Sequence, residues 1–116
     1  YYVAEEAVGN ALAAGTMFNI IHISSVVKID IMVRKTGEYR IEEFKRRRQV
    51  TLQGIPIWIV TKEDLILSKL EWASDSKSEL QLRDVRNLLA TNPDWDYLHR
   101  WAEYIGVSAL LKEVVE

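Results

Sequence analysis

The spacing of apolar residues changes near Thr61 from the period of a β-strand to the period of an α-helix. The β-branched and apolar runs that come before this position occupy 17–23, 26–33, 49–52 and 55–60. After it, apolar residues recur every three or four positions, as in Leu82, Val85 and Leu88. Strand side chains alternate between two faces, whereas helical side chains return to one face about every 3.6 residues. The sequence therefore predicts an α+β fold, in which a small mixed or antiparallel sheet precedes a C-terminal helical bundle.

Turn residues divide the first part of the chain into separate elements. A helix is predicted over 4–14, because an Ala- and Glu-rich stretch ends there at Gly15. Ser24-Ser25 separates two apolar runs, which favours two adjacent antiparallel strands. The stretch 41–48 predicts a short, very basic helix or turn, and Gln53-Gly54 then predicts the connection of a β-hairpin.

Capping residues divide the second part into three or four helices. Thr61 begins the first helix, and Asp64 three residues later completes an arrangement that resembles a capping box. Asn92-Pro93-Asp94 and Gly106 supply the later breaks. Asp94 and Asp96 match the spacing of two metal ligands, but they follow a proline at a helix start, where aspartates cap backbone N–H groups. We therefore expect a structural role for them.

Composition limits the classes of protein that the chain can belong to. Its 116 residues, 48% of them apolar, predict a single domain with a sheet-rich part at 1–60 and a helical part at 61–116. The net charge of −2 points to no global attraction for nucleic acid. The lack of cysteine excludes a disulfide scaffold, thiolate metal site or cysteine nucleophile. Apolar runs of a few residues are too short to span a bilayer, so we expect a cytoplasmic protein without a membrane partner.

Two charged residues of the helical part occupy positions that a solvated face would not explain. Lys69 falls inside the apolar arc of its helix, so its stem must cross an apolar stripe. Its ammonium could point at a phosphate or carboxylate in a cleft, or the side chain could simply cover its apolar neighbours. Asp84 lies at the edge of an apolar stripe between Leu80 and Leu88. It could pair with Lys69 across a helix interface, or it could belong to a site for substrate or metal.

Asp30 is a carboxylate within a predicted strand, where aspartate is disfavoured. It could lie on an exposed strand face beside Lys28, or it could supply an oxygen ligand to Mg²⁺. His22 and His99 show no metal-ligand spacing.

The run from Lys45 through Arg46, Arg47 and Arg48 is the strongest local concentration of charge. It could contact the backbone of a nucleic acid, or it could be ordinary solvated surface. The four tryptophans fall within apolar patterns, so we expect them in the core before any base-stacking role.

Several short motifs together resemble the C-terminal part of the nucleotidyltransferase-like proteins related to AbiEii-type toxins. In chain order these motifs are Lys28-Ile29-Asp30-Ile31, Phe44-Lys45-Arg46-Arg47, the stretch 61–70, and Leu82-Arg83-Asp84-Val85. The resemblance covers about 18–101. It implies a partial nucleotidyltransferase-like fold, with Asp30 as a metal ligand and with Lys69 and Asp84 lining the nucleotide pocket. It also implies Mg²⁺ as cofactor and an NTP substrate in a bacterial protein, with tRNA or a protein as acceptor and an antitoxin as partner.

The family's Gly-Ser motif and Asp-x-Asp pair normally lie upstream of these motifs, and this sequence contains no Gly-Ser. We therefore expect further residues before Tyr1 and no nucleotidyl transfer by this chain alone, because that chemistry depends on metal and positioning. One hypothesis is a fragment of a nucleotidyltransferase. The other is a non-catalytic module that binds RNA or protein through its basic segment. A sheet that lacks its first strands would expose an edge, where self-pairing would give a homodimer.

Overall fold

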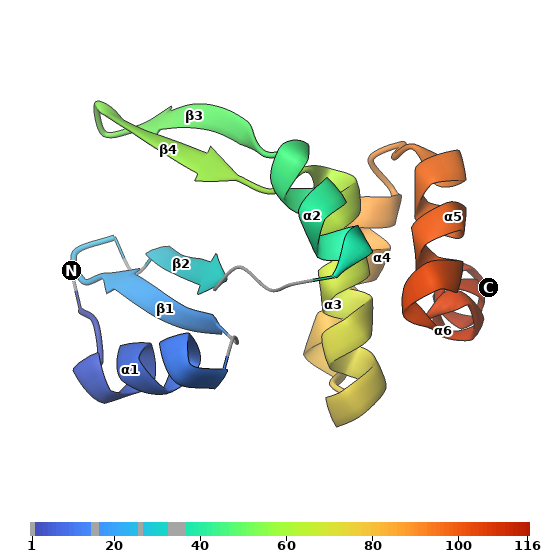
Figure 1. Ribbon diagram of the computed structural model, residues 1–116, viewed down its shortest axis with the longest axis horizontal. Coiled ribbons are helices and arrows are strands. Elements are labelled where there is room, and N and C mark those ends of the chain that lie inside the picture. Colours follow the sequence, from blue (N-terminus) through green and yellow to red (C-terminus); the bar gives the residue numbers. More distant parts are fainter. Residues whose placement is uncertain (1, 15–16, 26, 33–36) are drawn as a thin grey trace. The chain divides into compact units, whose positions relative to one another are not determined.

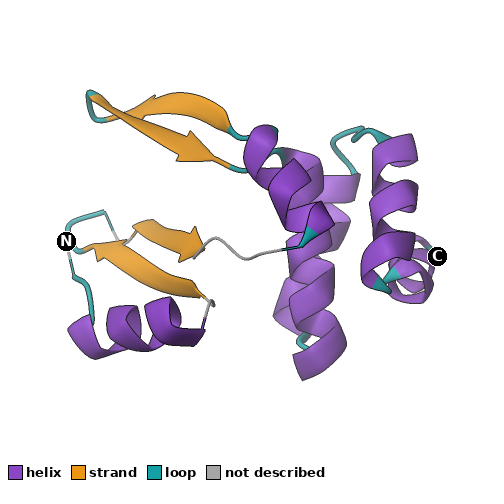
Figure 2. Cartoon of the chain, viewed as in Figure 1, coloured by secondary structure: helices purple, strands orange, loops and turns teal. Residues whose placement is uncertain are grey.

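A computed structural model describes residues 2–14, 17–25, 27–32 and 37–116. Within these ranges the chain forms an α+β structure whose C-terminal part is helical, as the sequence predicted (Figure 1). Two antiparallel two-stranded sheets occur in the described part, one formed by β1 and β2 and one by β3 and β4 (Figure 2). The backbone groups into two compact units, Tyr1–Ile41 and Glu42–Glu116. The boundary between the two units lies before the second sheet, whereas the last strand of the described part ends at Ile59 and the elements after it are helices.

The first unit contains one helix and one sheet. Strands β1 (Met17–His22) and β2 (Val27–Met32) pair antiparallel, with Asn19 opposite Asp30. Helix α1 (Glu5–Ala14) contacts β1 and buries Ala11. These elements match the predicted ranges to within one residue, although the predicted stop at Gly15 lies outside the described residues.

Helix α2 (Glu38–Lys45) begins three residues earlier than the basic segment that we predicted over 41–48. Its acidic first residue and basic last residue both suit the dipole of a helix, which favours negative charge at the N-terminus and positive charge at the C-terminus. Arg48, which we had placed in the basic segment, instead begins strand β3 (Arg48–Leu52). The basic run is therefore divided between a helix end and a strand.

The hairpin of β3 and β4 (Ile55–Ile59) has the two-residue connection that the sequence predicted. Gln53 and Gly54 both have positive φ angles, 50° and 79°, which is the geometry of a type I′ turn. Such a turn matches the twist of the flanking strands. Most of the hairpin is exposed, including aliphatic residues such as Leu52 and Ile55.

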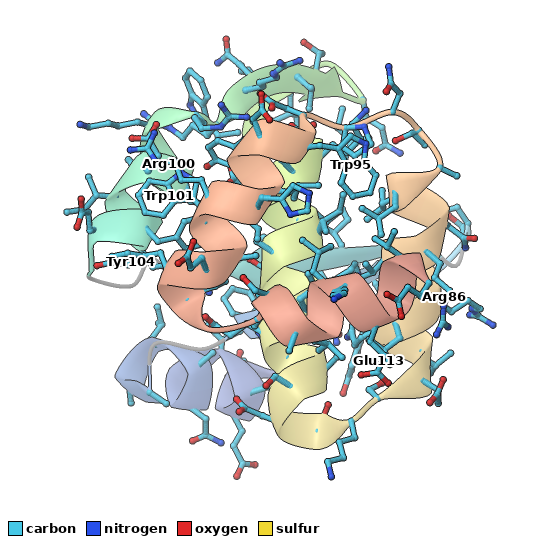
Figure 3. All side chains as sticks on the ribbon, turned by 90° about the vertical axis from the view of Figure 1, so that its right-hand side faces the viewer. Arg86, Trp95, Arg100, Trp101, Tyr104 and Glu113 are labelled. Atoms are coloured by element: carbon cyan, nitrogen blue, oxygen red, sulfur yellow. The ribbon has the colours of Figure 1, made fainter. Side chains whose placement is uncertain are left out.

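Four helices complete the second unit, and the first of them is central. Helix α3 (Lys62–Ser76) contacts α4 (Glu79–Leu89), α5 (Trp95–Ile105) and α6 (Ser108–Val115). The core that these contacts enclose consists of Ile66, Leu67, Leu70, Ala73, Val85, Leu98, Trp101, Ala102, Val107, Leu111 and Val114. Figure 3 shows Trp101 and Tyr104 on one side of α5, and the centroids of their rings are 5.3 Å apart.

The helix boundaries follow the predicted capping chemistry. The Thr61 hydroxyl accepts a hydrogen bond from the Asp64 backbone N–H, and the Asp94 carboxylate accepts one from Tyr97. Gly106 ends α5 with a left-handed φ of 81°. The capping role that we assigned to Asp94 is thereby confirmed. No helix in the described part of the chain combines the length and apolar character that crossing a membrane requires.

Candidate functional site

The N-terminus of α3 holds a fully buried carboxylate, Asp64, with no exposed surface. The hydroxyl of Thr61 donates a hydrogen bond to its Oδ2 at 2.7 Å. The phenol of Tyr97, from α5, donates to its Oδ1 at 2.6 Å. A buried carboxylate is costly unless it is paired and hydrogen-bonded, so these contacts stabilise a charge that would otherwise oppose folding.

The Arg46 guanidinium provides the positive charge beside this carboxylate. Its Nε lies 3.5 Å from Asp64 Oδ2, and its Nη2 lies 3.5 Å from Glu63 Oε1. The guanidinium carbon also lies 3.8 Å from the centroid of the Tyr97 ring, which is a cation–π geometry. Among the described residues the buried Nε makes an ion pair without a hydrogen bond. Arg46 therefore joins the end of α2 to the starts of α3 and α5.

The surroundings of Asp64 raise the pKa of the Tyr97 phenol. Burial raises the pKa of its phenol above the usual range, and the hydrogen bond to Asp64 and the negative charge of that carboxylate raise it further. The nearby Arg46 charge lowers the pKa by a smaller amount. Tyr97 is therefore a neutral hydrogen-bond donor over the physiological pH range, and its role around Asp64 is to hold structure together.

Outside this buried cluster, the basic run forms a surface together with two aromatic residues. The Arg47 guanidinium lies 3.9 Å from the ring centroid of Phe44 and 4.7 Å from that of Trp58. It also donates a hydrogen bond to the Phe44 carbonyl at 2.8 Å. Lys45 and Arg48, which come before and after Arg47 in the sequence, are exposed. We call Phe44, Lys45, Arg47, Arg48 and Trp58 the basic–aromatic surface. Arg48 projects from the face of the hairpin opposite to that of Trp58, because strand side chains alternate.

The predicted contact between Lys69 and Asp84 is present. The Lys69 ammonium lies 3.1 Å from Asp84 Oδ2, and it donates a hydrogen bond to Gln81 Oε1 at the same distance. The Lys69 side chain is 13% exposed and that of Asp84 is 44% exposed. The lysine is therefore shielded between α3 and α4, while its carboxylate partner remains accessible to solvent.

The described residues contain no group of three His, Cys, Asp or Glu side chains that could hold a metal ion. The backbone of Asp30 lies in β2, but its side chain is outside the described part of the structure. The role of Asp30 as a Mg²⁺ ligand therefore stays a prediction.

The roles of Arg46 and Tyr97 could not be predicted from the sequence, and Trp58 does not lie where it was expected. Nothing in the spacing of Arg46 or Tyr97 indicated that both contact Asp64, because the contacts depend on how α2 and α5 pack against α3. Thr61 followed by Asp64 did mark the helix start. We expected Trp58 in the core, and that prediction was wrong: the side chain is 57% exposed. Its hairpin presents it to solvent, whereas Trp101 on α5 is buried as expected.

No known protein family, curated protein or solved structure matches this chain.

Proposed function

We propose that this chain binds nucleic acid through the basic–aromatic surface, as the non-catalytic part of a nucleotidyltransferase-like protein. The observation that carries the proposal is the arrangement of the basic run. Lys45 and Arg48 are exposed, and Arg47 is held by a hydrogen bond and two aromatic rings. The charge of Arg46 is paired with Glu63 and Asp64, and its side chain is only 30% exposed, so Arg46 is left out of the basic–aromatic surface.

Local charge, not net charge, supports binding to phosphate. The chain as a whole has a charge of −2, which repels a polyanion weakly. Three cationic side chains within four residues offset that repulsion at one place. Arginine presents several N–H donors in a planar fork that suits phosphate oxygens, and fixing Arg47 in advance lowers the entropy lost on binding.

The test measures the salt dependence of binding to a single-stranded RNA. Releasing counterions from single strands gives a slope of log K against log salt of about −0.7 for each phosphate neutralised. Replacing Lys45 and Arg48 together by alanine should reduce the magnitude of the slope by about 1.4 and weaken binding.

The matched control replaces Arg83 and Arg86 by alanine. Both are exposed on α4, and the double change removes the same charge (Figure 3 labels Arg86). The proposal predicts little change in slope for this control. Equal losses in both double variants would show diffuse attraction instead of a site.

A second candidate function, nucleotidyl transfer, is favoured by the contact between Lys69 and Asp84. Lys69 is shielded, Asp84 keeps access to solvent, and the two residues come from separate helices. In this proposal they line one side of a nucleotide pocket. A protein that also carries the Gly-Ser and Asp-x-Asp motifs would bind Mg²⁺ as a cofactor and transfer the nucleotidyl group of an NTP to tRNA or a protein. An antitoxin would inhibit that protein. The same contact has a structural alternative, in which the pair only joins α3 to α4.

Replacing Lys69 by methionine separates these two roles, because methionine keeps most of the apolar stem and removes the ammonium. If Lys69 lines a nucleotide pocket, Lys69→Met should lose NTP binding by this chain, measured by equilibrium dialysis. The urea midpoint of unfolding should stay nearly unchanged. Lys62→Met is the control, since Lys62 lies on the same helix and donates to the Thr91 carbonyl instead. NTP binding that is equal in the wild type and Lys69→Met would reject the pocket.

In a protein that carries the upstream motifs, the corresponding assay is Mg²⁺-dependent transfer of labelled nucleotide to RNA or protein. Asp30→Asn and Lys69→Ala should each lower the rate. Unchanged transfer in both variants would reject the assignment of Asp30 and Lys69.

A further inference from the structure

We infer that the Trp58 indole is a stacking platform for a base, so that the nucleic acid bound at the basic–aromatic surface is single-stranded. This inference rests on the proposed function and identifies its ligand more closely. A tryptophan side chain that is 57% exposed on a strand leaves a large apolar plane in contact with water. Stacking against the π-face of a base would remove that plane from water and needs no particular base sequence.

The geometry around the indole suits such stacking. The Arg47 guanidinium lies over the Trp58 ring with its carbon 4.7 Å from the centroid, and it also lies over Phe44. The guanidinium therefore covers part of the indole, and more than half of the Trp58 surface remains exposed to solvent. A base placed on that surface would add a layer to an arrangement of planar groups that already exists in the protein.

The hairpin register adds a polar group beside the platform. Gln49 is the direct cross-strand partner of Trp58, and directly opposite residues project from the same face of an antiparallel pair. Gln49 is exposed, and its amide has both donors and acceptors for the edge of a base. The aliphatic residues Leu52 and Ile55, which are also paired, alternate onto the other face, and so does Arg48 at the start of β3.

This combination favours a single strand over a duplex or an acidic protein. In a duplex the bases are already stacked and paired, so none can lie on an indole without being extruded. An acidic peptide would use the cationic side chains but would leave the indole without a planar partner. A single strand supplies phosphates for Lys45 and Arg47 and an exposed base for Trp58 at the same time.

The experiment compares two single strands of equal charge. The 116-residue chain is titrated with an oligouridylate of about eight nucleotides, within the range of single-strand sites, and with an abasic strand of the same length. The wild type should bind the oligouridylate roughly tenfold more tightly. Trp58→Ala should remove most of that difference and leave affinity for the abasic strand nearly unchanged.

Two further variants control for folding and for position. Trp58→Phe retains an aromatic face and should recover part of the lost affinity. Leu80→Ala removes an exposed apolar side chain from α4, outside the hairpin, and should bind like the wild type. Circular dichroism spectra and melting curves check that each variant is folded, and the comparison of the two strands on the wild type requires no variant at all.

The outcomes separate this inference from the proposed function. If the wild type binds the two strands equally and with the expected salt dependence, the stacking platform is rejected and phosphate binding stands. If neither strand binds in a salt-dependent manner, both proposals are rejected. Binding of a duplex of equal length, or of polyglutamate, as tightly as the oligouridylate would also overturn the assignment of a single strand.

Discussion

At the scale of single residues, the buried Asp64 carboxylate in the second unit requires partners for its charge and its hydrogen bonds. It has no exposed surface, and its carboxylate is held by Thr61, Tyr97 and Arg46. Three elements therefore meet at one negative charge. Removing the hydroxyl of Thr61 or of Tyr97 should leave that charge with unmet hydrogen-bonding capacity, which costs more than the net value of the bond itself.

Tyr97→Phe tests this requirement with the smallest change, because it removes only the hydroxyl that donates to Asp64. We expect the free energy of unfolding to fall by about 1 to 3 kcal/mol, measured by urea denaturation. Tyr104→Phe is the control: its side chain is 56% exposed and keeps its ring contact with Trp101. Equal stability of Tyr97→Phe and the wild type would show that Asp64 does not depend on the phenol.

The same hydroxyl predicts a dependence of stability on alkaline pH. The pKa of Tyr97 is raised in the folded protein, whereas an unfolded tyrosine has a pKa of about 10. The folded state therefore holds this proton more tightly, so its contribution is fully present below about pH 10 and is lost as the pH rises further. Urea midpoints measured across this range should fall more steeply for the wild type than for Tyr97→Phe. Parallel curves for the two proteins would contradict the assignment.

At the scale of elements, the hairpin depends on its turn. Gly54 has a φ of 79°, and a Cβ added there would meet no described atom within 4 Å. Gly54→Ala is therefore costly only through backbone conformation, by about 1 to 2 kcal/mol. Amide hydrogen exchange in β3 and β4 should become roughly tenfold faster as the hairpin opens more often.

Gly9→Ala is the contrasting variant for that measurement. Gly9 lies in helix α1, where an added Cβ likewise meets no described atom within 4 Å. Alanine should stabilise this helix by up to about 1 kcal/mol, because glycine has the lower helix propensity. Slower exchange in β3 and β4 of Gly54→Ala would contradict the turn assignment.

Elements with local signals were predictable from the sequence, and contacts between elements mostly were not. The turn at Gln53 and Gly54 and the caps at Thr61 and Asp94 each depend on neighbouring residues, so their residue types were sufficient. The Lys69–Asp84 contact was also accessible, because helical spacing placed both residues toward an apolar stripe. The bond between Asp64 and Tyr97 joins residues 33 positions apart and carries no periodic signal.

Trp58 and Arg46 show the opposite failures of the same reasoning. An apolar run predicted a buried Trp58, but a hairpin with only two strands leaves much of its surface in water. For the run of four cations, the sequence left open a nucleic-acid contact or solvated surface, but helix α2 ends within the run and turns Arg46 toward Glu63 and Asp64. In both cases the residue type shows which interactions a side chain can make, and the packing of helices and strands determines which partners it contacts.

At the scale of the whole molecule, the two compact units should differ in independent stability. The second unit has a core drawn from several helices around α3, whereas the first has about 40 residues and a two-stranded sheet. Domains of that size rarely fold alone, and a two-stranded sheet is marginal in water. A fragment of residues 37–116, which keeps α2 whole, should unfold cooperatively in urea, and a fragment of residues 1–36 should show no transition. Loss of cooperative unfolding in the longer fragment would show that its core depends on the first 36 residues, and the nucleic-acid experiments would then require the full chain.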